Sequence, residues 1–297
     1  MRNYGAIILA IQELNKQGVD VTKYLDRIET IIGHESMMDE NVFNHHSKGL
    51  TIDIEILPNY GHRQPIKNRD PREPMMAEKL KLERWIQDIF VRRLKDQYKL
   101  IKAEYKIDKL KKVPRPKNDK DYIDELITAL VTGASDGINL FQLRLNIGMD
   151  LTKPNENAAK WAKDYAYELI KGIDETSLKL VQDAVTNFVE DQGYTIGEVI
   201  DYLSYEFGDV RASRIAVTET TRAFAEGQKM AADELKQEFP DTAIYKTWFT
   251  NNDDIVCDDC GPLDGVEVPM DDEFEVGVDG PPYHVNCRCW VDYNTKL

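Results

Sequence analysis

The residues whose types and spacing best suit chemistry are cysteines and a histidine near the C-terminal end of the chain. All four cysteines fall in the last 41 residues, in two pairs, and the second pair follows a histidine. The candidate ligands are Cys257, Cys260, His284, Cys287 and Cys289. Two thiolates separated by two residues can bind one ion, and a second pair from a later segment completes a tetrahedral zinc site.

Five candidate ligands compete for the four positions of such a site. We expect His284 and Cys287 to join the pair Cys257 and Cys260, with Cys289 as the replacement ligand or a packed thiol. Cysteines gathered at one end of a chain are more typical of a metal site than of the disulfides that brace small secreted proteins. The expected cofactor is therefore structural zinc, with reduced thiols or a disulfide as the alternative.

A catalytic metal is disfavoured by the same residues. A closed four-ligand zinc site leaves no position for substrate, whereas catalysis needs an open position and a general base. Asp258, Asp259 and Asp264 belong to no motif that orders them for that role. Zinc deaminases carry His-x-Glu before Pro-Cys-x-x-Cys, a pair that this sequence lacks, and a glycine-rich phosphate loop is also missing. We therefore predict no catalytic residues and a protein that is not an enzyme.

A second polar motif runs from Arg211 to Arg222, in a segment with helical spacing. On a helix, Glu219 lies one turn from Arg222, and Arg214 lies one turn before Thr218. A lone glutamate without a histidine partner or a second carboxylate makes a poor general base. We interpret the motif as an ion-paired, partly buried helix face.

A long basic helix is expected between Met75 and Pro114, where apolar residues recur at three- and four-residue steps. The chain has a net charge of -15, yet residues 63–120 hold 19 Lys or Arg against 9 Asp or Glu. The polar face of the helix would carry Arg92, Arg93, Lys95, Lys99, Lys102 and Lys106. Gathered on one face, such residues could contact DNA phosphates; the alternative is an ordinary solvated helix.

Further helices are expected on both sides of this segment. Apolar spacing predicts a short helical hairpin over residues 1–33, and alternation over residues 52–56 predicts one strand. From residue 121 to about 237 helix follows helix, with expected ends at Gly172 and Gly193 and a new helix from Val210.

The pattern changes after Pro240, where alternating residues predict a strand over 243–249 and two short strands near 266–268 and 289–293. The predicted fold class is mainly α, with an elongated helical body and a small C-terminal β module that zinc could stabilise. We expect four segments. They are an N-terminal helical or mixed segment (1–74), a long basic helix and linker (75–120), the helical body (121–240) and the β module with the Cys/His cluster (241–297).

Residues from about Ala158 to Val291 resemble the phage head-morphogenesis or minor-capsid family, also called MuF-like. The resemblance depends on the order of several short pieces. These pieces are Trp161–Ala166, Ile170–Ile173, the Ile-Ala-x-Thr-Glu core within Arg211–Glu219, Trp248–Thr250, Asp254-x-x-Cys257-x-x-Cys260, and Pro281-Pro282-x-His284-x-Asn286-Cys287-Arg288-Cys289.

The resemblance implies a minor capsid protein of a tailed bacteriophage, acting in head assembly and in DNA retention or ejection. Implied partners are the portal protein, the major capsid or scaffold protein, and packaged DNA through residues 63–120. No apolar run is long enough to span a membrane, so we expect a location inside the head near the portal, and the host cytoplasm during assembly. The alternatives are a zinc-dependent DNA-processing enzyme of the nuclease kind and a DNA-binding accessory protein, whose affinity would fall steeply with salt.

Overall fold

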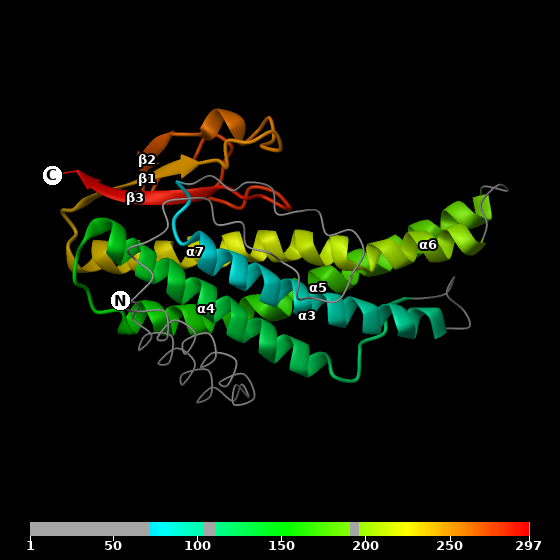
Figure 1. Cartoon of the computed structure of the whole chain (residues 1–297). Helices are drawn as coiled ribbons and strands as arrows, with labels where there is room; N and C mark the ends of the chain where they lie inside the picture. Colours follow the sequence, from blue (N-terminus) through cyan, green and yellow to red (C-terminus); the bar gives the residue numbers. More distant parts are fainter. Residues whose placement is uncertain (1–71, 104–110, 191–195, 297) are drawn as a thin grey trace, which may run out of the picture.

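The computed structural model describes residues 72–103, 111–190 and 196–296 (Figure 1). The elements, labelled as in Figure 1, are the helices α3 (Met76–Ala103), α4 (Asp119–Leu145), α5 (Thr152–Glu190), α6 (Ile196–Glu206) and α7 (Asp209–Glu238), then β1 (Ala243–Phe249), the short 3-10 helix η2 (Gly261–Leu263), β2 (Glu267–Pro269) and β3 (Trp290–Lys296). The mainly α fold class with a small C-terminal sheet is confirmed. The hairpin expected over 1–33 and the strand expected over 52–56 lie outside the described residues, and the four-segment division remains a prediction.

Helix α7 contacts each of the other four α-helices that the structure describes and so forms the axis of the helical body. The apolar stripe predicted for α3 is buried in this body. Its buried members are Leu82, Trp85, Ile86, Ile89, Leu94 and Ile101. They meet Leu126 and Leu130 of α4 and Phe224 of α7 in one core. Within the described residues, no helix combines the length and the apolar character needed to cross a bilayer.

Two glycines let α4 and α7 approach backbone to backbone. A Cβ atom added at Gly227 would lie 1.9 Å from the carbonyl oxygen of Ala134, and one at Gly137 would lie 2.2 Å from that of Phe224. Neither distance leaves room for a methyl group. Glycine at both positions therefore sets the spacing of the two helices on which the sheet rests.

The helix end expected at Gly172 is wrong, because α5 continues unbroken from Thr152 to Glu190. Its apolar face also continues across the glycine, with Ile170, Ile173 and Val181 all buried. A glycine inside a helix costs about 1 kcal/mol relative to alanine. Burial of the flanking apolar side chains offsets that cost, and the second end expected at Gly193 lies outside the described residues.

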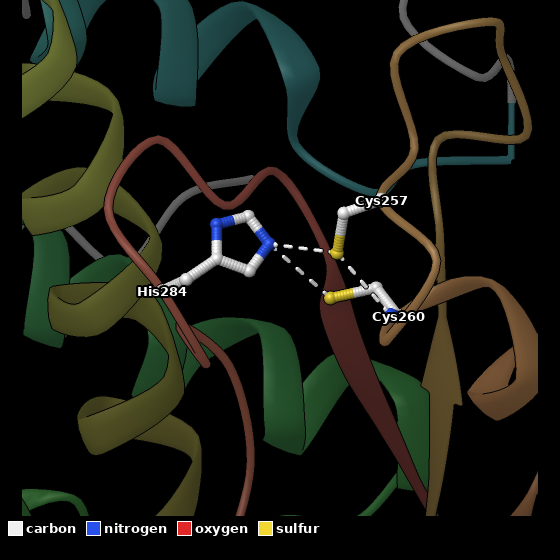
Figure 2. Close-up of side chains that lie close together, drawn as sticks. All are labelled: Cys257, Cys260 and His284. Atoms are coloured by element: carbon white, nitrogen blue, oxygen red, sulfur yellow. Dashed lines mark hydrogen bonds between the residues drawn. The ribbon is translucent and has the colours of Figure 1, made fainter.

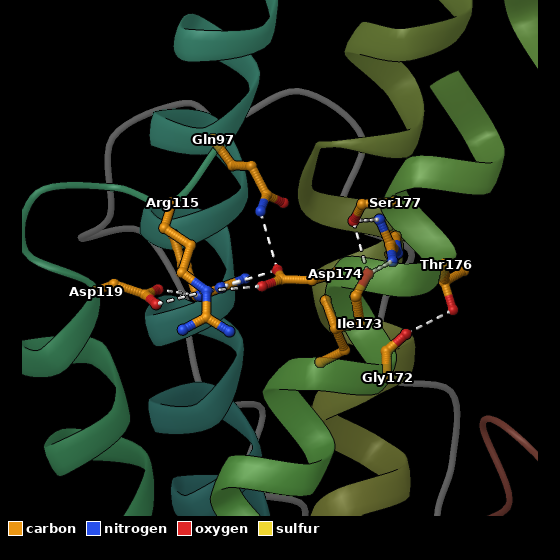
Figure 3. Close-up of polar contacts among 10 residues, drawn as sticks. Gln97, Arg115, Asp119, Gly172, Ile173, Asp174, Thr176 and Ser177 are labelled. Carbon is orange, nitrogen blue, oxygen red and sulfur yellow. Dashed lines mark hydrogen bonds and ion pairs between the residues drawn. The ribbon is translucent and has the colours of Figure 1, made fainter. Parts of the chain in front are cut away.

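Arg93 does not lie on the polar face of α3, which corrects a second expectation. Its side chain is fully buried, with Nε donating to Asp119 at 2.8 Å and Nη2 donating to Asp174 at 2.9 Å. Gln97 donates a further hydrogen bond to Asp174, and Arg115 lies 3.6 Å from the same carboxylate (Figure 3). Arg93 therefore joins the start of α4 and the middle of α5 to α3.

The three strands form an antiparallel sheet in the order β2-β1-β3. Strand β1 pairs along its whole length with β3, from Ala243 opposite Lys296 to Phe249 opposite Trp290. One face of the sheet covers α4 and α7 (Figure 1). The core between the sheet and these helices contains Phe141 of α4, Leu235 of α7 and Trp248 of β1. The β module therefore shares its core with the helical body.

Candidate metal centre

The first pair of candidate ligands lies in the loop between β1 and η2. The backbone N–H of Cys260 donates to the Sγ atom of Cys257 at 3.3 Å, and the N–H of Gly261 donates to the carbonyl oxygen of Cys257 at 2.9 Å. These two bonds close a tight turn around the two thiols. The turn leaves both sulfur atoms on the side that faces the loop before β3.

His284 comes from that second loop and points its Nε2 atom at the two sulfurs (Figure 2). Nε2 lies 3.1 Å from the Sγ atom of Cys257 and 3.4 Å from that of Cys260. The other ring nitrogen, Nδ1, lies 2.8 Å from the carbonyl oxygen of Val285, an acceptor that requires the proton on Nδ1. A histidine that binds a metal through one nitrogen commonly donates the other N–H to a carbonyl in this way.

Cys287 and Cys289 lie close to Cys260. Their sulfur atoms and that of Cys260 all lie within 4.8 Å of one another, as do the ligand atoms of Cys257, Cys260 and His284. Cys260 belongs to both groups, so the five predicted ligands form two overlapping groups of three. In a tetrahedral zinc site, bond lengths of 2.0–2.3 Å separate the ligand atoms by about 3.6 Å. Each group therefore offers three ligand atoms of the kinds that bind zinc.

The surroundings of the thiols divide them into two kinds. Burial raises the pKa of Cys257, but hydrogen bonds from the backbone N–H and side chain of Cys260 outweigh it, so the net pKa is lowered. A hydrogen bond from Cys289 lowers the pKa of Cys287 to about 5. Burial raises the pKa of Cys260, and the hydrogen bond to Cys287, together with burial, raises that of Cys289. One thiol in each pair thus favours the thiolate, the form that binds metal.

The loop that carries His284 and Cys287 rests on α7. Thr218 accepts a hydrogen bond at its Oγ1 atom from the backbone N–H of Asn286 at 2.8 Å. Thr221 donates from its own Oγ1 to the carbonyl oxygen of Cys287 at 3.0 Å. Two contacts from one helix therefore fix the backbone on both sides of the bond between Asn286 and Cys287.

A second brace joins the two ligand loops directly. Arg288 donates hydrogen bonds from Nη1 and Nη2 to the two carboxylate oxygens of Asp253, at 2.8 and 2.7 Å respectively. Both side chains are largely buried, with exposed fractions of 12% and 15%. Bidentate arginine–carboxylate pairs fix geometry as well as adding energy, so this pair sets the distance between the loops.

The rest of the polar motif on α7 is an ion-paired helix face, which confirms that interpretation. Glu219 is 4% exposed and accepts a hydrogen bond from the hydroxyl of Tyr165 at 2.7 Å. Nε of Arg222 lies 3.4 Å from the same carboxylate. Arg211 donates to the hydroxyl of Ser177 at 2.9 Å, which joins α7 to α5.

Four residues of the site were missed at the level of sequence: Thr218, Thr221, Asp253 and Arg288. The two threonines are three residues apart and so share a helix face, a signal that predicts a common contact without naming it. Arg288 stands between two candidate ligands, which places its backbone at the site. Its partner, Asp253, lies 35 residues earlier, and spacing alone does not connect the two.

The described residues form a helical body and a small β module, which carries the cysteine and histidine candidate ligands and rests on α7. The model of a family described as Phage Mu protein F like protein matches residues 179–292. The match runs from the last third of α5 into β3, and it confirms the resemblance inferred from the motifs. The match supports a phage head-morphogenesis protein. Comparison with curated proteins and with solved structures gave no match.

Proposed function

We propose that the chain is a minor capsid protein of a tailed bacteriophage, associated with the portal and the inner head. It acts in head assembly and in DNA retention or ejection, and its role is structural rather than enzymatic. The supporting observation is the family match, because residues 179–292 contain α7, all five candidate ligands and most of the sheet. The match therefore covers the β module together with the helix on which it rests.

The metal in this proposal is structural zinc held by Cys257, Cys260, His284 and Cys287, with Cys289 as the alternative to Cys287. Two of the three strands have seven residues and the third has three. Long loops connect them. Bound zinc would join the two loops by a cross-link, which small modules with limited cores commonly require.

The proposed partners are the portal protein, the major capsid or scaffold protein, and packaged DNA. Support for the DNA contact comes from the exposed lysines around the end of α3 and the linker before α4. They are Lys99, Lys102, Lys111, Lys112 and Lys117. Arg93 belongs to the interior, so the proposed contact surface is smaller than the basic segment 63–120 as a whole.

A stop codon in the gene tests the proposed role within the phage that encodes it. We expect a large loss of plaque titre that the gene restores in trans, and heads that are defective under electron microscopy. An unchanged titre with normal heads would contradict the proposal. Metal-dependent cleavage of DNA by the purified chain, lost in His284→Ala, would instead favour the nuclease alternative.

A further inference from the structure

Two hydroxyl groups on α7 contact the ligand loop without belonging to the cluster itself. Thr218 accepts from the N–H of Asn286 while its own hydroxyl donates to the carbonyl oxygen of Arg214 at 2.7 Å. Thr221 donates to the carbonyl oxygen of Cys287. Both threonine side chains are buried in the interface between α7 and the loop.

These contacts lie at the turn of the ligand loop, where the backbone changes direction. Asn286 has a φ of 66°, in the left-handed region, and it lies between His284 and Cys287. A non-glycine residue keeps this conformation where its surroundings hold it. Thr218 binds the N–H of this residue, and Thr221 binds the carbonyl group of the next one. The turn that aims His284 at the first cysteine pair is thus held from α7.

We propose that Thr218 and Thr221 are positioning residues for the metal centre and couple metal binding to the docking of the β module on α7. The inference rests on the metal site proposed above. Residues that orient the ligands of a metal commonly change its affinity about 10- to 100-fold when they are replaced. Coupling between two binding events is reciprocal, so bound metal also strengthens the contact between the loop and the helix.

The chain offers a close control on the same helix. Thr220 lies between the two positions, is 1% exposed, and has a buried Oγ1 atom without a hydrogen-bond partner. Replacing it with valine removes a buried hydroxyl of the same kind but breaks no contact with the loop. A loss of affinity that is specific to Thr218 and Thr221 therefore reports the two hydrogen bonds and not a general change in α7.

The experiment measures Zn²⁺ affinity of the full chain by competition with a chromophoric chelator, and ligand geometry from the absorption of bound Co²⁺. We expect Thr218→Val and Thr221→Val to bind Zn²⁺ about 10- to 100-fold more weakly than the wild type. Amide exchange in residues 284–290 should become faster in both variants with metal present. Thr220→Val should match the wild type, and Thr218→Ser and Thr221→Ser should recover most of the affinity because they keep the hydroxyl.

Each alternative outcome identifies what has failed. A wild type that binds neither Zn²⁺ nor Co²⁺ would refute the metal site, and with it this inference. Wild-type binding with unchanged affinity in both valine variants would refute the inference alone. Serine variants as weak as the valine variants would also refute it, because the loss would then come from packing. Far-ultraviolet helicity and the melting temperature of the helical body, measured on the same samples, identify any variant that fails to fold.

Discussion

Glu219 is a carboxylate buried between α5 and α7, and its surroundings give the fold a pH dependence. Burial raises the pKa of Glu219, although Arg222 and the hydroxyl of Tyr165 act in the opposite direction. A raised pKa in the folded state means that the contribution of this group to stability is full below its unfolded pKa of about 4.3. The contribution is then lost as the pH rises through the folded pKa.

Glu219→Gln should therefore gain stability relative to the wild type as the pH rises. Glutamine keeps an acceptor for the hydroxyl of Tyr165 and carries no charge to desolvate. We expect the two melting temperatures to be close near pH 4 and to diverge in favour of the variant towards pH 8. Thermal melts across that range test this, with the exposed Glu168→Gln as a control that stays equal to the wild type. A variant less stable by the same amount at every pH would contradict the prediction.

The candidate ligands could be predicted from the sequence because their chemistry is carried by residue type and local spacing. Cys257 and Cys260 are close in the chain, so one turn is enough to bring their thiols together. The residues that orient the ligands could not be predicted in this way. Thr218 reaches Asn286 across 68 positions, and that contact depends on how the module docks on α7. Spacing along the chain carries no such information.

Among the helices, Arg93 connects α3 to both α4 and α5 through ion pairs with Asp119 and Asp174. We expect Arg93→Leu to lower the free energy of unfolding by about 3–5 kcal/mol, because it leaves the carboxylates of Asp119 and Asp174 without their buried partner. Lys99→Ala, which removes an exposed ion pair with Asp96 on the same helix, should cost about 0–1 kcal/mol. Chemical denaturation followed by circular dichroism measures both. Equal losses for the two variants would show that the buried network has no special role.

The close contact between α4 and α7 makes a second prediction for the elements. We expect Gly227→Ala to destabilise the fold by about 1–3 kcal/mol or more, because the new methyl group would overlap the backbone of Ala134. Gly172→Ala, where a Cβ atom meets nothing within 4 Å, should instead stabilise α5 by about 0.5–1 kcal/mol. Denaturation midpoints of the two variants should therefore move in opposite directions, and a stabilising Gly227→Ala would contradict the packing described.

Element boundaries could be predicted where a local signal was strong. The helix expected from Val210 corresponds to α7, which begins at Asp209 directly after Gly208, and the strand expected over 243–249 is β1. The helix end predicted at Gly172 is wrong because a glycine ends a helix only where the residues beyond it do not favour continuation of the helix. In α5 the apolar face on both sides of the glycine is buried by α4 and α7. That tertiary contribution is not visible in a window of sequence.

For the molecule as a whole, removal of a metal ligand should affect one end of the structure. We expect Cys257→Ser or Cys287→Ser to make the C-terminal module sensitive to protease while far-ultraviolet helicity is retained. The reason is that the core among the helices α3–α7 contains none of the cysteines. The core beneath the sheet contains Cys260, Cys287 and Cys289, and Cys257 packs against it. Chelation of metal from the wild type should have the same effect.

Limited proteolysis with mass mapping of the fragments measures this directly. Val285→Ser provides the control, because this residue lies in the same loop and its side chain is 66% exposed. Protease resistance that does not change in the cysteine variants would refute a stabilising role for the cluster. Simultaneous loss of helicity would show instead that the two cores unfold as one unit.

The overall plan of the chain, helices followed by a small β module with the ligands, follows from the change in periodicity after Pro240. The docking of that module does not. Trp248 and Phe141 lie more than a hundred residues apart, yet both belong to the core between the sheet and the helices. Only the packed structure identifies the surface that buries them.

We propose above that this protein is a minor component of a phage head. Quantitative mass spectrometry of purified virions, with packaged and emptied heads compared, measures its copy number in each kind of particle. We predict a few copies per packaged particle, and a decrease in emptied heads would indicate ejection with the DNA. Absence from both kinds of particle would contradict the account.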